Sequence, residues 1–366
     1  MTSTLYCAVI LPFASTTLDA TGTEAETVGP GDIVGEMALL TGQVRSVLTV
    51  ARASADPATG IVERALRASD LTARCELVLL HEPGTTRPSR SAEWLAQRDV
   101  AAHHHVRTDS VGDIRRLARR ASGRAVGLVR GGGGARGFAH IGALRAFDEA
   151  GIDIDIIGGT SIGSVIAGAY ALGLSTRELM DLARAFASRK RLLDRTLPVV
   201  ALMRGAKITA IYGSVYGDAQ IEDLWTPYFA VSSGLTRAVA VVHAQGSLWQ
   251  AARASTAVPA IFPPIIAAKR EVLVDGSVMN NMPLDVMRQW CEGGTVLGVN
   301  RCPSTSRSAT IVADPVCRDG ARCAASGGCS VPGHAPRPSS VPSCVPPRST
   351  ARAACVSRRF ARSPIS

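Results

Sequence analysis

The chain has few aromatic residues, only 4% of its 366 positions, and it has no lysine or arginine before Arg45. The apolar stretch at 5–13 therefore lacks the positively charged flank of a secretory signal. The six cysteines of residues 301–366 include no C-x-x-C pair, so the spacing typical of a zinc site is missing there. These absences favour a cytoplasmic protein that needs no metal and has at most peripheral contact with a membrane.

Positive charge is concentrated at one end of the chain. The formal net charge is +10, and residues 301–366 contain ten arginines against two acidic residues, a net +8. The remainder is close to balance, so nucleic acid is not expected as a partner. Residues 301–366 also hold nine of the twenty prolines and show no hydrophobic period, which predicts a disordered tail.

Two glycine-rich turns organise the middle of the sequence. Residues 125–129 form a short apolar run that four glycines end, and apolar residues then recur at helical spacing over 136–150. A second apolar run at 154–157 leads into another sharp turn and an apolar helix at 164–172. This order predicts two parallel strands joined by a right-handed crossover, within a three-layer α/β/α domain whose sheet is mostly parallel.

The second turn contains the pattern Gly159-x-Ser161-x-Gly163. A serine on a tight strand-to-helix turn has strained backbone angles, so the residues two positions away must lack side chains. Its hydroxyl then projects at a helix N-terminus, where backbone N–H groups favour negative charge. The pattern predicts a nucleophile elbow, and the structural alternative for Ser161 is an ordinary helix N-cap.

The first turn leaves backbone N–H groups uncovered at Gly132, Gly133 and Gly134. Such groups can stabilise the oxyanion of acyl transfer. The alternative is a dinucleotide fingerprint, because Gly132, Gly134 and Gly137 fit G-x-G-x-x-G after a strand. That fingerprint needs an acidic residue at the end of the second strand. Asp153 and Asp155 lie near the required distance, but the strand runs past both of them into the elbow. The oxyanion interpretation is therefore favoured.

A third motif follows about a hundred residues later, where a short apolar strand ends at Asp275-Gly276. Together with the GGGGARG turn at 131–137 and the GGTSIG turn at 158–163, it resembles the patatin-like phospholipases. The resemblance covers about residues 125–300. Asp-Gly by itself is also a common turn dipeptide, so the order of all three motifs carries the resemblance.

The resemblance implies a catalytic dyad without histidine. Ser161 is the expected nucleophile and Asp275 the expected base, while the glycine turn and Arg136 are expected to line the oxyanion hole. Ser277 departs mildly from the family, which usually has glycine or alanine there. His140 lies on the helix after the first turn, and we interpret it as structural because the family's chemistry does not use histidine.

Residues 31–53 resemble the phosphate-binding cassette of cyclic-nucleotide-binding domains. Glu36 and Arg45 have the spacing of the residues that hold the ribose and the cyclic phosphate in that cassette, and arginine suits a phosphate. The β-roll that precedes such a cassette needs more residues than are present, so we expect an incomplete module at 1–57. A truncated regulatory protein that binds a cyclic nucleotide is the alternative function.

Residues 58–124 are expected to be a connector, with a strand at 75–81 and a short helix at 91–98. Its HEP and HHHVR segments resemble bacterial relatives of neuropathy target esterase. His103, His104 and His105 point in different directions in a helix or strand and have no acidic or cysteine ligand at usable spacing, so we interpret them as structural. Five arginines between 115 and 124 predict a solvated helix face, with anionic lipid headgroups as the alternative contact.

The sequence as a whole predicts a serine esterase domain at 125–300, between the N-terminal module and the tail. The expected substrates are acyl esters of phospholipids or lysophospholipids, and no cofactor is expected. The apolar, proline-containing segment 255–268 is expected either to contact an acyl chain or to cover the core. The uncharged stretch 156–176 is long enough to suggest a membrane span, but a buried strand, turn and helix explain it better.

Overall fold

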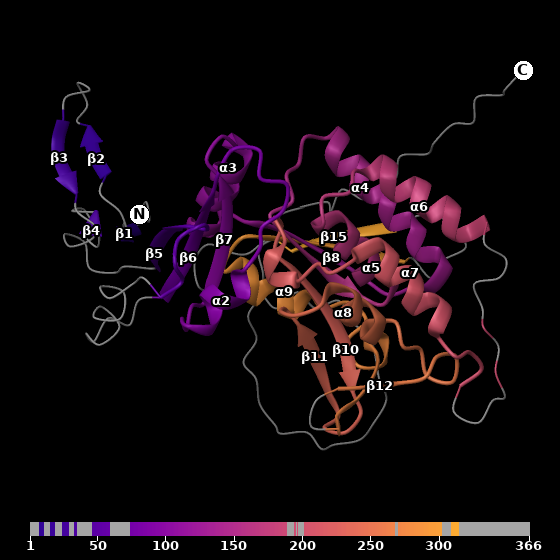
Figure 1. Cartoon of the computed structure of the whole chain (residues 1–366). Helices are drawn as coiled ribbons and strands as arrows, with labels where there is room; N and C mark the ends of the chain where they lie inside the picture. The colour runs from indigo at the N-terminus through magenta and orange to yellow at the C-terminus, as the bar shows by residue number, and fades with distance from the viewer. Residues whose placement is uncertain are drawn as a thin grey trace, which may run out of the picture. The chain divides into compact units, whose positions relative to one another are not determined.

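The computed structural model describes residues 7–10, 15–18, 24–28, 33–34, 46–58, 74–188, 194, 196, 201–267, 270–301 and 309–314. All of these residues lie in one compact unit, Met1–Gly320. They form two larger sheets and a separate two-stranded pair, β2 (Ser15–Leu18) with β3 (Glu24–Val28) (Figure 1).

The N-terminal sheet has the strand order β4-β1-β5-β6-β7. Its strands are β4 (Ile33–Val34), β1 (Cys7–Ile10), β5 (Ser46–Arg52), β6 (Arg74–His81) and β7 (Ala102–Arg107). Strands β1, β5, β6 and β7 are parallel to one another, and the outer strand β4 is antiparallel to β1. The segment expected as a connector therefore contains two strands of a sheet.

Alternation along β6 explains how this sheet buries both of its faces. Leu77 and Leu79 pack with Trp94 of helix α2 (Ser91–Ala96), whereas Val78 packs in a separate cluster toward Leu117 of α3 (Val111–Ala121). Successive side chains of a strand point to opposite faces, so one apolar run serves both helices. The strand expected at 75–81 and the helix expected near 91–98 are confirmed.

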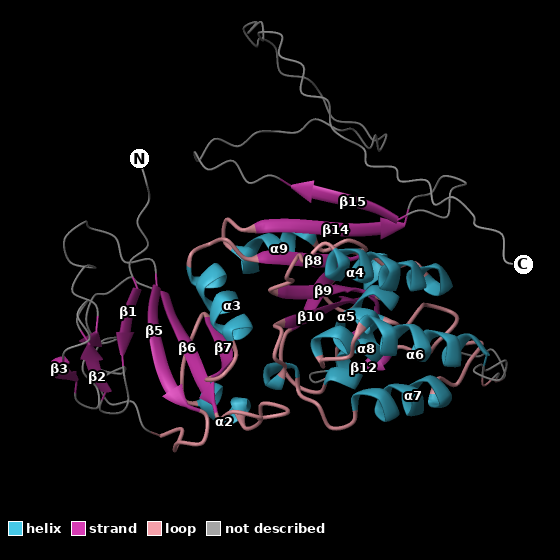
Figure 2. Cartoon of the chain, turned by 90° about the horizontal axis from the view of Figure 1, so that it is seen from above, coloured by secondary structure: helices cyan, strands magenta, loops and turns pink. Residues whose placement is uncertain are grey.

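The second sheet has the order β12-β13-β10-β9-β8-β14-β15, with β11 also paired to β10. Figure 2 shows β15, β14, β8, β9 and β10 side by side. The four central strands β10, β9, β8 and β14 are parallel, and the outer pairings are antiparallel. The strands are β8 (Val126–Arg130), β9 (Ile156–Thr160), β10 (Tyr228–Gly234), β11 (Val239–His243), β12 (Ile265–Ile266), β13 (Val272–Asp275), β14 (Thr295–Arg301) and β15 (Ala309–Asp314).

Helices cover both faces of this sheet. Helix α9 (Leu284–Cys291) packs with Val129, Ile156 and Phe229 on one face. Further helices pack in the core on the other face of this sheet. They are α4 (Ala139–Glu149), α5 (Ile162–Ala171), α6 (Thr176–Ser188), α7 (Ala206–Tyr216) and α8 (Leu248–Ser255). The expected α/β fold with a mostly parallel sheet between two helical layers is confirmed.

The uncharged stretch 156–176 is folded as part of the second sheet and its helices. Residues 156–176 form β9, a turn and α5, and among the described residues no helix has both the length and the apolar character to cross a bilayer.

Strand β15 lies inside the tail expected to be disordered and pairs with β14 along its whole length. That expectation is wrong for 309–314, because the composition argument averaged over a short β-branched run.

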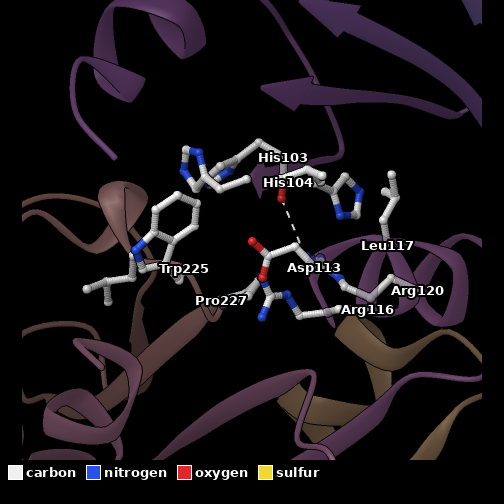
Figure 3. A pocket seen from close by; sticks show the side chains of 11 residues that line it. His103, His104, Asp113, Arg116, Leu117, Arg120, Trp225 and Pro227 are labelled. Atoms are coloured by element: carbon white, nitrogen blue, oxygen red, sulfur yellow. Dashed lines mark hydrogen bonds and ion pairs between the residues drawn. The ribbon is translucent and has the colours of Figure 1, made fainter. Parts of the chain in front are cut away.

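The histidines of β7 lie at the junction between the N-terminal sheet and the second sheet's connecting segments. Nε2 of His103 and Nε2 of His105 donate to the carbonyl oxygen of Glu222, at 3.0 and 2.8 Å. His104 points elsewhere, to the Glu76 carboxylate at 2.6 Å. Figure 3 shows the pocket at this junction, which is lined by residues that include His103, His104, Asp113, Arg116, Arg120, Trp225 and Pro227.

Three arginines of α3 turn toward the protein. Arg116 pairs with Asp113 at 2.7 Å, Arg119 forms a bidentate pair with the fully buried Asp155, and Arg120 donates to the His103 carbonyl at 3.4 Å. The solvated face expected for this helix is therefore wrong for these three residues. Arg115 and Arg124 are exposed, as expected.

The junction histidines predict that stability falls in mild acid. Burial lowers the pKa of His103 and of His104 to about 4, from an ordinary value of 6.5. Between these values the unfolded chain binds protons that the folded chain does not, so acidification favours unfolding. We expect the free energy of unfolding to fall between about pH 7 and about pH 5, by on the order of 1 kcal/mol for each buried histidine. Thermal melts at the two pH values should show this as a lower melting temperature at the lower pH.

Paired substitutions provide the control for this pH dependence. Burial also lowers the pKa of His105 well below its ordinary value. In a His103→Gln/His105→Gln variant the amides can donate to Glu222 without titrating, so the slope of melting temperature against pH should be shallower than in wild type, with His104 as the remaining contributor. An unchanged slope would contradict the assignment to these residues.

Candidate active site

The elbow predicted around Ser161 is present at the end of β9. Ser161 has φ 54° and ψ −131°, a left-handed region that a non-glycine residue seldom occupies, and it caps α5. A Cβ added to Gly159 or to Gly163 would overlap the carbonyl oxygen of Arg130. Both glycines are therefore required by the close approach of the backbone at the end of β8.

The hydroxyl of Ser161 donates a hydrogen bond to Oδ2 of Asp275 at 2.6 Å. Both residues are buried, with 7% and 1% of their surfaces exposed. The other oxygen, Asp275 Oδ1, accepts from the backbone N–H and the hydroxyl of Ser277 at 2.8 and 2.7 Å. The carboxylate is thus fixed by one residue and faces the serine with its second oxygen.

Glycine after the aspartate has a structural reason. A Cβ on Gly276 would overlap the carbonyl oxygen of Val231 in β10. The pairing of β13 with β10, which places Asp275 opposite Ser232, therefore allows only glycine at this position. An ordinary Asp-Gly turn does not require glycine for this reason. Here the close contact of Gly276 with β10 fixes the position of the neighbouring Asp275 carboxylate.

The glycine turn lies against the segment that follows Asp275. The Gly132 amide donates to Asn281, to Oδ1 at 3.2 Å and to the carbonyl oxygen at 3.3 Å. Within the described part of the chain, the amides of Gly133 and Gly134 have no hydrogen-bond partner, and Gly134 is exposed. Arg136 is exposed on the 3₁₀ helix η2 (Gly134–Phe138). The turn therefore offers two free donors beside an anchored one.

His140 has a different partner from the one a catalytic triad would give it. Its Nε2 donates to the carbonyl oxygen of Gly131 at 2.9 Å, which holds the glycine turn. Burial, with a further contribution from the charge of Arg130, lowers the pKa of His140 to about 4. Because the Nε2 donor is used by the Gly131 carbonyl, the geometry agrees with a structural role.

Arg130 is an unusual residue beside this site. Its side chain is fully buried, and none of its three guanidinium nitrogens has a hydrogen-bond partner among the described residues. Burial lowers its pKa to about 9, and the guanidinium lies 5.9 Å from the centre of the Tyr170 ring. It therefore places positive charge on the face of the sheet that α5 covers, beside Tyr170.

The sequence did not reveal the contacts that Asn280, Asn281 and Ser277 make in this site. Asn281 anchors Gly132, and the backbone carbonyl of the preceding Asn280 accepts from Thr160 Oγ1 at 2.8 Å. Ser277 was regarded only as a departure from the family, yet it fixes Asp275. The short polar run Asn280-Asn281 beside the Asp-Gly pair is the only sequence signal that could have pointed to this segment.

The expected cyclic-nucleotide residues cannot be placed. Glu36 and Arg45 lie outside the described residues, so their role stays a prediction. Among the residues that are described, no group of three histidine, cysteine or acidic side chains is arranged to hold a metal ion.

The glycine contacts give a test of the elbow geometry. We expect Gly163→Ala to destabilise the protein by at least about 2 kcal/mol, because the added methyl group must displace backbone rather than a flexible side chain. Gly142→Ala on α4 is the matched control, since nothing lies within 4 Å of its Cβ position and helical alanine is favoured over glycine. Chemical denaturation of both variants measures the difference, and similar stabilities would refute the tight backbone contact.

The chain is similar to known families and proteins. Residues 128–288 match the family profile of the patatin-like phospholipases. Residues 41–128 match the P-loop-like domain of the neuropathy target esterase family. This match includes the whole segment expected as a connector, 58–124, and residues 41–57 of the expected N-terminal module. Among solved structures, VipD from Legionella pneumophila has a TM-score of 0.39 and 18% sequence identity, over 48% of this chain and 50% of that chain.

Several curated proteins are similar over about two thirds of this chain. Patatin-like phospholipase domain-containing protein 7 of Mus musculus is 35% identical over 278 residues, 67% of this chain and 21% of that protein. The corresponding protein 6 of Homo sapiens is 36% identical, over 67% and 20%. Lysophospholipase nte1 of Emericella nidulans is 33% identical over 302 residues, 67% and 20%.

The chain spans about one fifth of the length of these relatives. Its two matched regions have the same order as the two sheets described above. The chain therefore carries a patatin-like phospholipase domain that follows a P-loop-like domain of the neuropathy target esterase family.

Proposed function

We propose that this chain is a serine esterase that hydrolyses acyl esters of phospholipids or lysophospholipids. The observation that carries the proposal is the 2.6 Å hydrogen bond from Ser161 Oγ to Asp275 Oδ2, made by a serine held in a left-handed conformation. A short hydrogen bond to a carboxylate is charge-assisted, and it orients the serine proton toward its acceptor.

Asp275 can take up and return a proton in each half of ester hydrolysis, first in acylation of Ser161 and then in deacylation. Asp275 takes the proton of Ser161 as Oγ attacks the ester carbonyl, and it returns that proton to the departing alcohol oxygen. A water molecule then attacks the acyl-serine and gives a proton to Asp275. As the bond between the acyl group and Ser161 Oγ breaks, Asp275 passes that proton to Oγ, and the fatty acid is released. Asp275 Oδ2 is suited to this role because Ser277 occupies only the other oxygen.

The oxyanion of each tetrahedral intermediate needs donors close to Ser161. Among the residues that the structure describes, none accepts a hydrogen bond from the amides of Gly133 and Gly134, whereas that of Gly132 is bound to Asn281. We therefore assign oxyanion stabilisation to Gly133 and Gly134, with Gly132 as the anchored start of the turn. Removing one such donor typically costs about 3–4 kcal/mol in the barrier.

The substrate class follows from the relatives and from exposed apolar side chains near the dyad. One relative carries the name lysophospholipase. Val278 and Met279, which follow Asp275 closely, are 52% and 38% exposed, and Ile261 in the segment 255–268 is also exposed. We propose that these side chains contact the acyl chain, since exposed apolar groups beside a site favour an apolar ligand.

Dyad substitutions test this proposal. We expect Ser161→Ala and Asp275→Asn each to lower kcat for a lysophospholipid by at least about 10³-fold, because nucleophile and base act as one unit. A fluorophosphonate probe should label wild type and should not label Ser161→Ala. A folded wild type that neither hydrolyses the lipid nor takes the label would refute the proposal.

His140→Gln separates this dyad from a histidine-based mechanism. Glutamine can still donate to the Gly131 carbonyl but cannot act as a base, so we expect kcat to stay within about tenfold of wild type. A loss as large as that of Asp275→Asn would assign the base to His140 instead.

A further inference from the structure

Helix α8 ends beside the nucleophile, at a serine that the proposed chemistry does not use. Ser255 is fully buried. Its hydroxyl donates to the carbonyl oxygen of Val231 in β10 at 2.6 Å and accepts from the backbone N–H of Ser161 at 2.9 Å. The hydroxyl thus joins the elbow to the neighbouring strand.

The Ser161 amide needs such a partner. It follows the last residue of β9 and precedes α5, so neither strand pairing nor helical bonding supplies an acceptor for it. Its residue also has a left-handed φ of 54°, a conformation that persists only where surrounding contacts hold it. Ser255 Oγ provides the acceptor at the position where the chain is strained.

The turn that follows Ser255 at the end of α8, residues 255–257, also holds the proposed base. The backbone N–H of Asp275 donates to the carbonyl oxygen of Ala257 at 2.9 Å, two residues after Ser255. Strand β10 completes the arrangement, because Val231 pairs with Thr160 and the next residue, Ser232, pairs with Asp275. The turn at 255–257 therefore contacts the nucleophile and the base through different atoms.

We propose that Ser255 is a positioning residue for the dyad, which holds the Ser161 backbone so that Oγ meets both Asp275 Oδ2 and the substrate carbonyl. This inference rests on the proposed esterase function. Ser255 acts through Ser161 and neither receives nor gives a proton in the reaction. The segment 255–268, which the sequence left open between acyl contact and core cover, thus begins with a residue that organises the site.

The test compares Ser255→Ala and Ser255→Thr with Tyr216→Phe in the full chain. Tyr216→Phe is the matched control, because it also removes a buried hydroxyl that donates to a backbone carbonyl of the elbow helix, Val165 at 2.7 Å, without contacting Ser161. The readouts are kcat and KM for a lysophospholipid, the rate of fluorophosphonate labelling, and the folded fraction by circular dichroism.

We expect Ser255→Ala to lower kcat and the labelling rate by about tenfold or more at full folding, with KM within about twofold, since misplacing a reacting group costs rate rather than binding. Ser255→Thr keeps the hydroxyl and should recover a measurable part of kcat. Tyr216→Phe should keep the wild-type kcat. If Ser255→Ala does not fold, Ser255→Cys replaces it, and the same order of rates is expected.

Equal kcat in wild type and Ser255→Ala would overturn the positioning role, as would an equal loss in Tyr216→Phe. These results differ from a failure of the proposed function. In that case wild type itself would show no labelling that depends on Ser161, whereas overturning only the positioning role leaves wild type active and labelled.

Discussion

The candidate active site depends on direct contact between two backbones. Strands β8 and β9 are parallel neighbours, and their register places Arg130 opposite Gly159. The carbonyl oxygen of Arg130 then lies where a Cβ of Gly159 or of Gly163 would stand. Because no side chain separates the two turns, the glycine turn after β8 reaches the serine after β9, and amides and nucleophile share one edge of the sheet.

An antiparallel strand brings in the second half of the dyad. Asp275 is 114 residues from Ser161, yet β10 pairs with both β9 and β13 at adjacent positions. Parallel strands with helical crossovers place successive turns at the same edge, and β13 reaches that edge from the opposite direction. Gly276 is the point of contact, since its missing side chain admits the Val231 carbonyl.

The P-loop-like domain contacts the starts of the catalytic strands rather than the turns at their ends. Asp155, just before β9, accepts from the Arg119 guanidinium of α3 and also from the Val126 amide at the start of β8. A dinucleotide site at the glycine turn would have required a carboxylate near Asp155 for a ribose. Here Asp155 is fully buried and bonded to Arg119, and Asp153 is paired with the same arginine. This arrangement disfavours a ribose contact at either carboxylate.

The sequence by itself determined the local parts of this protein: the strands and helices of the two glycine turns, Ser161 on its elbow, and the Asp275-Gly276 pair. Each is specified by residues within a few positions, since apolar period and glycine set the local backbone. Asn281 on Gly132, Ser255 on Ser161, the turning of α3 arginines into the protein and the pairing of β15 carry no local pattern. Only the tertiary structure decided them, because strand register and packing bring together atoms that are far apart in sequence, and many polar residues could have met there equally well.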